Sequence, residues 1–153
     1  MSSGNRQGIF EVGKTKDWAE IESMRNRYAA TMVIDAYPYQ TMPLKLAAKY
    51  PGKVFANYYQ SDKKGAGVIR WDYADGVVRS DRTKIIDSVV SEINSKDIIF
   101  NTTATELEEY IEHWQNIYRI LKDTALGVKR PHWQRVEDKQ DDYAHATVYW
   151  RIA

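Results

Sequence analysis

Hydrophobic and polar positions repeat with two periods along the chain, and each period predicts its own kind of element. Short apolar runs predict strands at residues 8–12, 31–36, 53–59 and 98–100, and a hairpin of runs 68–71 and 76–79 around the turn signal Asp75-Gly76. Apolar residues at helical spacing predict helices at residues 17–30, 41–50, 81–95 and 105–122, with a last helix from about residue 141. Because strands and helices alternate through much of the chain, the pattern indicates an α/β fold with a mixed sheet flanked by helices, in one domain.

The composition limits the chemistry of any site. The 153 residues include 22 basic and 21 acidic side chains, so binding of a polyanion has to come from a local patch. Cysteine is absent, which excludes disulfides, zinc–thiolate sites and thiol nucleophiles. A metal would be held by Asp, Glu or His, ligands that suit magnesium or manganese. No apolar run reaches the roughly 18 residues of a membrane span and no signal-peptide core is present, so we expect a cytosolic protein without membrane contact.

The last segment carries the densest candidate chemistry. Apolar residues recur every four positions from Ala144 to Ile152 and predict one stripe of a helix. Asp141 and His145 are four residues apart and Asp142 and His145 are three apart, so each pair can share a helix face. Two carboxylates and an imidazole within one turn are either a helix cap, which the helix dipole favours, or half of a divalent-metal site. Residue types alone favour the cap.

Asp35 is the second candidate. It lies at the end of a predicted buried strand, and α/β folds place their ligands at the carboxyl ends of such strands. Alternatively, Asp35 caps the next helix or holds the turn before Pro38. The combination of a strand-end Asp with Asp-x-x-His at the start of the last helix makes Asp35 a candidate metal ligand, because the chain has no other dense ligand cluster.

Two groups of cations are candidate contacts to a nucleic-acid backbone. Arg79, Arg82 and Lys84 surround a predicted helix start with Asp81 as its cap, and a helix N-terminus with flanking cations is a natural phosphate site. The second group belongs to a basic, partly extended stretch that leads into the last helix, and it begins with Lys129 and Arg130. The alternative for the first group is a solvated, capped helix end.

The order of these features resembles the C-terminal nuclease domain of the large terminase subunits of tailed phages and prophages, the motor-nucleases that cut and package viral DNA. The matching stretches are MVIDAYP at residues 32–38, VVRSDRTKIID at 77–87, IIF at 98–100 and DDYAHATVY at 141–149. The resemblance covers most of the chain from about residue 8. It implies an RNase H-like fold that hydrolyses the phosphodiester bonds of double-stranded DNA with two divalent cations, Mg²⁺ or Mn²⁺, held by acidic residues.

The resemblance also implies roles for the candidate residues. Asp35 corresponds to the family's second acidic ligand, and the last helix supplies the third cluster through Asp142 and His145, with Asp141 as a neighbour or cap. The cations at residues 79–84 would face the DNA backbone. The family often has an Asp where His145 stands, so this histidine either keeps the ligand set or shifts its metal preference.

Part of the family's pattern does not occur in these 153 residues. The first catalytic Asp of the family sits on an early strand that would lie upstream of Gly8, and the ATPase motor domain is also absent. We therefore expect a nuclease domain at residues 8–153, truncated at its N-terminus, after a polar tail or turn at residues 1–7. Such a fragment should have weak activity or none. The alternative is a non-catalytic remnant that binds DNA or a packaging partner through its basic stretches.

The missing strands imply partners. In an RNase H-like sheet the first strand pairs beside the strand that ends in Asp35, so without it residues 31–36 present an unpaired apolar edge. We expect this edge to form a homodimer, to pair with residues 1–12, or to take strands from another chain. The resemblance adds the terminase motor domain and the portal as partners, in the cytoplasm of a bacterial host.

Overall fold

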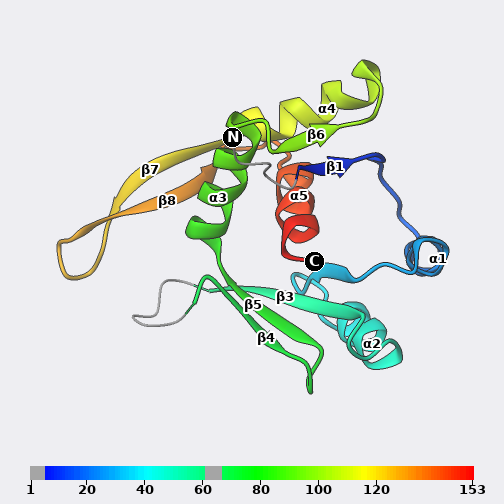
Figure 1. Ribbon diagram of the computed structural model, residues 1–153. Helices are drawn as coiled ribbons and strands as arrows, with labels where there is room; N and C mark the ends of the chain where they lie inside the picture. Colours follow the sequence, from blue (N-terminus) through cyan, green and yellow to red (C-terminus); the bar gives the residue numbers. More distant parts are fainter. Residues whose placement is uncertain (1–5, 61–66) are drawn as a thin grey trace. The chain divides into compact units, whose positions relative to one another are not determined.

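The chain divides into two compact units. The computed structural model describes residues 6–60 and 67–153 (Figure 1). Of these, unit 1 contains residues 6–13 and 86–145, and unit 2 contains residues 14–60, 67–85 and 146–153. Helices and strands alternate in the chain, which confirms an α/β fold. Two helices, α3 (Arg82–Asn94) and α5 (Asp142–Ile152), carry the chain from one unit into the other.

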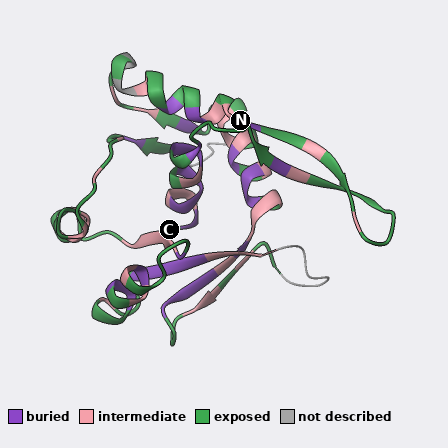
Figure 2. Cartoon of the chain, turned by 180° about the vertical axis from the view of Figure 1, so that it is seen from behind, coloured by how far each residue is buried: buried purple, intermediate pink, exposed green. Residues whose placement is uncertain are grey.

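Unit 2 is built on a mixed four-stranded sheet. Its strands are β2 (Met32–Asp35), β3 (Val54–Gln60), β4 (Ile69–Asp72) and β5 (Val77–Asp81), in the order β2-β3-β5-β4. β2, β3 and β5 are parallel, whereas β4 and β5 form the antiparallel hairpin that the Asp-Gly turn predicts. The apolar centres of β3 and β5 are buried (Figure 2), as expected for parallel strands covered on both faces. The mixed sheet is therefore confirmed.

Two helices belong to unit 2 alone. Helix α1 (Trp18–Tyr28) begins after Asp17, whose Oδ1 accepts a hydrogen bond from the backbone N–H of Ala19 at 2.8 Å and so caps the helix. Helix α2 (Thr41–Lys49) connects β2 to β3 and approaches the β4–β5 turn. A Cβ at Gly76 would lie 2.8 Å from the Cβ of Ala47, and Gly76 has a φ of 62°. Glycine at this turn therefore allows α2 to pack closely.

Unit 1 contains a short parallel pair and two helices. β1 (Gln7–Ile9) pairs with β6 (Ile98–Phe100). Of the three alternatives for the edge at residues 31–36, pairing with residues 1–12 is therefore not formed by residues 7–9. Within the described residues, β2 pairs with β3 alone, and its other edge is open. α3 begins after Asp81, whose Oδ1 accepts from the N–H of Lys84 at 3.0 Å, which confirms the predicted cap. Helix α4 (Ala104–Gln115) follows β6.

The prediction of one long helix at residues 105–122 is wrong in its second half. After α4 the chain forms β7 (Ile117–Asp123), which pairs antiparallel with β8 (Lys129–Arg135) along its whole length. The turn between them is closed by the N–H of Gly127, which donates to the carbonyl of Thr124 at 2.9 Å. The spacing of the apolar residues between positions 117 and 121 fits the apolar stripe of a helix. However, β-branched and aromatic residues also suit a strand, and pairing with β8 decides between the two.

The β7–β8 hairpin is attached to helix α3 by one carboxylate. Arg119 on β7 makes a bidentate ion pair with Asp87 on α3, with its Nε 3.0 Å from Oδ1 and its Nη2 3.2 Å from Oδ2. Trp133 on β8 donates its Nε1–H to the same Oδ1 at 2.8 Å. A two-stranded hairpin is marginally stable by itself, so these contacts help to hold it in place.

The last helix is predicted correctly. α5 begins one residue after Asp141, and the stripe Ala144, Val148 and Ile152 is buried. None of the helices in the described part of the chain is long and apolar enough to cross a membrane.

Candidate functional site

Asp35 lies at the carboxyl end of β2 in unit 2, half-buried, with both carboxylate oxygens engaged. Its Oδ1 accepts from the backbone N–H of Tyr37 at 3.0 Å, and its Oδ2 accepts from the hydroxyl of Tyr149 at 2.6 Å. The first contact is the turn before Pro38 that the sequence offers as one alternative. Each oxygen accepts one hydrogen bond and keeps a lone pair, so the carboxylate can still bind a cation.

Tyr149 was not singled out by its sequence position, although it follows His145 by one helical turn. Burial, followed by the nearby Tyr59 and the negative charge of Asp35, raises the pKa of the Tyr149 hydroxyl far above its usual value. The hydroxyl therefore keeps its proton throughout the physiological range and remains a donor to Asp35. The rings of Tyr149 and Tyr59 are 5.7 Å apart and fix this end of α5 to unit 2.

A buried polar pair lies on the strands beside Asp35. Asn57 is the register partner of Asp35 on β3, so the two side chains face the same side of the sheet. Asn57 is fully buried, and its Oδ1 accepts from the hydroxyl of Ser80 on β5 at 2.9 Å. Its Nδ2 has no partner among the described residues. The hydrophobic pattern of the sequence does not predict this pair, because Asn57 lies within an apolar run.

At the start of α5, in unit 1, His145 meets Asp141. The Nε2 of His145 is 3.2 Å from Oδ2 of Asp141, and the Nη1 of Arg135 is 3.8 Å from Oδ1. The backbone carbonyl of Asp141 also accepts from the N–H groups of Ala144 and His145. Asp141 is buried, while Asp142 is exposed. The carboxylate that pairs with the imidazole is thus that of Asp141, which was expected to be only a neighbour of the ligands or a helix cap. The side chain of Asp142 is exposed.

His113 holds the first turn of α5 from helix α4. It is 2% exposed, and its Nδ1 accepts from the backbone N–H of Tyr143 at 3.1 Å. The rings of His113 and Tyr143 are 4.8 Å apart. An imidazole nitrogen thus satisfies an N–H group that a helix start leaves without an intrahelical partner. The sequence contains no signal for this contact, which joins residues 30 positions apart.

The predicted cations around the start of α3 are partly engaged. Arg79 lies 3.7 Å from Asp72, and Lys84 lies 3.7 Å from Asp81. The guanidinium of Arg82 lies over the ring of Tyr59, 5.8 Å from its centre. Asp81 caps the helix, as the sequence predicts, so one of the N–H groups that a phosphate could bind is already engaged.

The second cationic group lies on the exposed hairpin. Lys129 and Arg130 begin β8 and are both exposed. Their register partners on β7 are Asp123 and Lys122. The hairpin therefore presents cations near its turn, as the basic character of this stretch predicts.

The structure brings some of the predicted site residues together. Asp141 and His145 meet in unit 1, whereas in unit 2 Asp35 meets Tyr149, which the sequence does not predict as a site residue. Within the described residues, no group of three or more His, Cys, Asp or Glu side chains has the spacing to hold a metal ion. Comparison of the chain with models of protein families, with curated proteins and with solved structures gives no match.

Proposed function

We propose that this chain is the metal-dependent endonuclease domain of a phage DNA-packaging terminase, an RNase H-like hydrolase of DNA phosphodiesters. The observation that carries the proposal is the placement of Asp35. Its half-buried carboxylate ends a parallel strand at the edge of the sheet, and Tyr37 and Tyr149 orient both of its oxygens. Ligands of α/β folds gather at such strand ends.

The open edge of β2 supports the same proposal. The resemblance places the family's first acidic strand beside the strand that ends in Asp35, and in the described residues β2 has a partner on one side only. A strand added at this edge would place its side chains next to Asp35. That strand would come from upstream sequence, another protein or a second copy of the chain.

The donor groups fit divalent cations in their chemistry. Asp35 retains lone pairs on both oxygens, and Asp142 is exposed. His145 supplies an imidazole, with Asp141 beside it. In the proposal, Asp35 in unit 2, and Asp142 and His145 in unit 1, are ligands of Mg²⁺ or Mn²⁺. Two such ions would supply activation of a water and stabilisation of the leaving oxygen. Arg82 and the hairpin cations Lys129 and Arg130 contact the DNA backbone.

The test follows manganese by its paramagnetic broadening of backbone NMR signals. We expect Mn²⁺ to broaden the signals around Asp35 and the signals around Asp142 and His145. Asp35→Asn should weaken this binding at least tenfold and abolish any Mn²⁺-dependent nicking of plasmid DNA. Glu108→Gln, which removes an exposed carboxylate from α4, is the matched control and should change neither result.

Two outcomes would refute the nuclease proposal. One is the absence of broadening around Asp35, and the other is unchanged nicking by Asp35→Asn. DNA binding that persists without metal, and that falls when Lys129 and Arg130 are replaced, would instead support the non-catalytic alternative. The exposure of both cations on β8 is the observation that favours it.

A further inference from the structure

The charge of the chain is unevenly divided between the two units. The described residues of unit 2 include twelve Lys and Arg against seven Asp and Glu, whereas in unit 1 the acidic residues outnumber the basic ones. The nearly balanced charge of the whole chain does not reveal this difference. An excess of cations attracts polyanions over a distance, so unit 2 is the unit on which a polyanion is expected to bind.

One face of the unit 2 sheet carries a row of aromatic and cationic side chains. Tyr58 on β3, Arg79 on β5 and Arg70 on β4 are register partners, so their side chains lie next to one another on this face. The ring of Tyr37, which follows β2, packs on the ring of Tyr58 with 5.6 Å between the two centres. These four residues form the Tyr–Arg row. The side chain of Asp35 faces the other side of the sheet, because its register partner is the residue before Tyr58.

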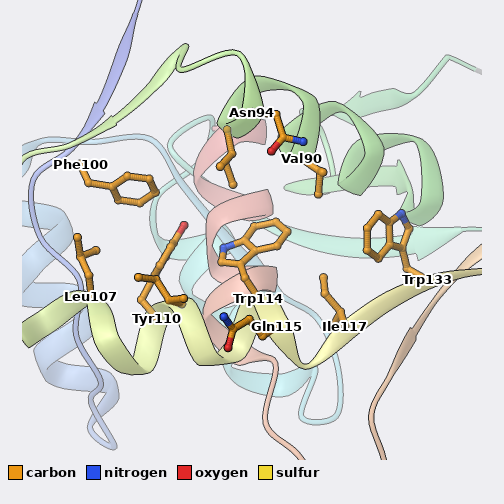
Figure 3. Close-up of a pocket in the computed structure, with 11 residues that line it drawn as sticks. Val90, Asn94, Phe100, Leu107, Tyr110, Trp114, Gln115, Ile117 and Trp133 are labelled. Carbon is orange, nitrogen blue, oxygen red and sulfur yellow. The ribbon is translucent and has the colours of Figure 1, made fainter. Parts of the chain in front are cut away.

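The side chains of the Tyr–Arg row reach the surface. Tyr37 is 58% exposed, Arg70 is exposed, and Tyr58 and Arg79 are half-buried. The arrangement in unit 1 is different, because there a cavity (Figure 3) is lined by the aromatic residues Phe100, Tyr110, Trp114 and Trp133. Rings and guanidinium groups at a surface, unlike rings packed around a cavity, can stack on a flat partner from outside.

Both arginines of the row can engage an anion. The guanidinium of Arg70 donates to the side-chain oxygen of Gln60, which is neutral. The Nη1 of Arg79 is 3.7 Å from Oδ2 of Asp72, and the two side chains are 38% and 37% exposed. An ion pair as exposed as this one contributes little to stability, so Arg79 can exchange Asp72 for a phosphate. Guanidinium groups bind phosphate oxygens in a bidentate manner.

The combination of rings and cations favours a single strand over a duplex. In duplex DNA the faces of the bases are stacked on one another, so the two tyrosine rings could reach only the backbone. The bases of a single strand offer their faces to aromatic side chains, while its phosphates remain available to arginine. An acidic protein surface would satisfy the arginines and leave the rings without a flat partner.

We propose that the Tyr–Arg row binds single-stranded DNA. Unpaired bases stack on Tyr37 and pack against Tyr58, and Arg70 and Arg79 bind the phosphates. The inference goes beyond the proposed nuclease activity, because it requires neither a metal ion nor Asp35. The excess of cations in unit 2 adds a long-range attraction for the strand.

The experiment compares oligonucleotides in the presence of EDTA, so that no metal-dependent step contributes. The first probe is a fluorescein-labelled oligothymidylate of about 12 nucleotides, and the second is its abasic counterpart, which has the same phosphates and no bases. The third is a duplex of the same length. Fluorescence anisotropy measures each Kd. Oligothymidylate should bind roughly tenfold more tightly than either of the other two probes, because only its bases are free to stack.

Two pairs of variants separate stacking from charge. Tyr37→Leu should weaken the binding of oligothymidylate about fivefold and leave its salt dependence unchanged. Its control is Tyr118→Leu, which removes a ring that is 41% exposed on β7 in unit 1 and should change neither quantity. Arg79→Gln should reduce the slope of log Kd against log salt concentration by about 0.7, the value for one phosphate contact of a single strand. Arg27→Gln removes the same charge from α1 and should leave this slope unchanged.

Equal affinity for oligothymidylate and the abasic oligomer would overturn the proposal, because charge alone would then explain the binding. Tighter binding of the duplex, or equal effects of Tyr37→Leu and Tyr118→Leu, would also overturn it. If polyglutamate competes as well as unlabelled oligothymidylate, the face belongs to an acidic protein instead. Tyr37 is exposed, so its replacement leaves the core of unit 2 intact. The result does not depend on whether the Asp35→Asn variant nicks DNA.

Discussion

The two groups of acidic candidates are positioned in opposite ways. In unit 2, Asp35 is held by Tyr149, which follows it by 114 residues. In unit 1, Asp141 meets His145 four residues later, within one turn of α5. The first contact exists only when the sheet and the end of α5 are folded together, whereas the second needs only the helix. The comparison predicts that long-range contacts hold the candidate site residues in position. The local pair should contribute little to the free energy of unfolding.

The largest effect should come from the long-range contact in unit 1. His113→Leu removes the acceptor of the buried Tyr143 N–H and the ring that packs on Tyr143. We expect a loss of about 2–3 kcal/mol in the free energy of unfolding, because a buried donor without a partner costs about 1–3 kcal/mol. Urea unfolding measures this loss, and amide hydrogen exchange at Tyr143 should become faster.

The matched control keeps an acceptor near the same place. The Oδ1 of His113→Asn lies near the position of the imidazole Nδ1, so this variant should recover part of the stability and of the protection at Tyr143. Equal losses in the two variants would show that packing, and not the hydrogen bond, holds the first turn of α5.

The next effect concerns Asp35 directly. Tyr149→Phe removes a hydroxyl that donates to a carboxylate and leaves the ring in place. Hydrogen bonds to charged groups contribute about 1.5–3 kcal/mol, so we expect a loss of about 2 kcal/mol at neutral pH. Tyr39→Phe is the control, because Tyr39 is 78% exposed and should change stability by less than about 0.5 kcal/mol. If Tyr149→Phe leaves the free energy of unfolding unchanged, the long-range contact in unit 2 does not stabilise the protein and the comparison fails.

The smallest effect should come from the local pair. Asp141→Asn weakens the contact with His145 but keeps a residue that caps helices equally well. A side-chain pair four residues apart on a helix contributes about 0.2–0.5 kcal/mol, so we expect a loss of about 0.5 kcal/mol in urea unfolding. A loss above about 2 kcal/mol would show that Asp141 holds the start of α5 as strongly as His113 does.

Local signals account for much of the fold. Asp81 caps α3, Asp75-Gly76 turns the β4–β5 hairpin, and β2 ends at Asp35, as the sequence predicts. The error at residues 117–122 has a physical cause. Their apolar spacing fits a helix, and pairing with β8 overrides that local preference.

The candidate site is less predictable than the fold. Residue type and position in an element suggest Asp35, Asp141 and His145 as candidates. They do not say which oxygen meets which partner. Tyr149 becomes a partner of Asp35 only because α5 packs on the sheet within unit 2, and His113 meets α5 only through the folding of unit 1. Such contacts depend on the path of the whole chain, which spacing along the sequence does not encode.

The close approach of α2 to the β4–β5 turn has a consequence for how this chain can vary. Gly76 and Gly127 both have positive φ angles, 62° and 71°. Around Gly127 there is open space for a Cβ, so Asn, which tolerates that backbone conformation, is an acceptable replacement. At Gly76 the backbone conformation and the neighbouring Ala47 both exclude a side chain. We therefore expect related sequences to vary in composition and length at the turn of residues 124–127. Residue 76 should remain glycine as long as α2 packs against the β4–β5 turn.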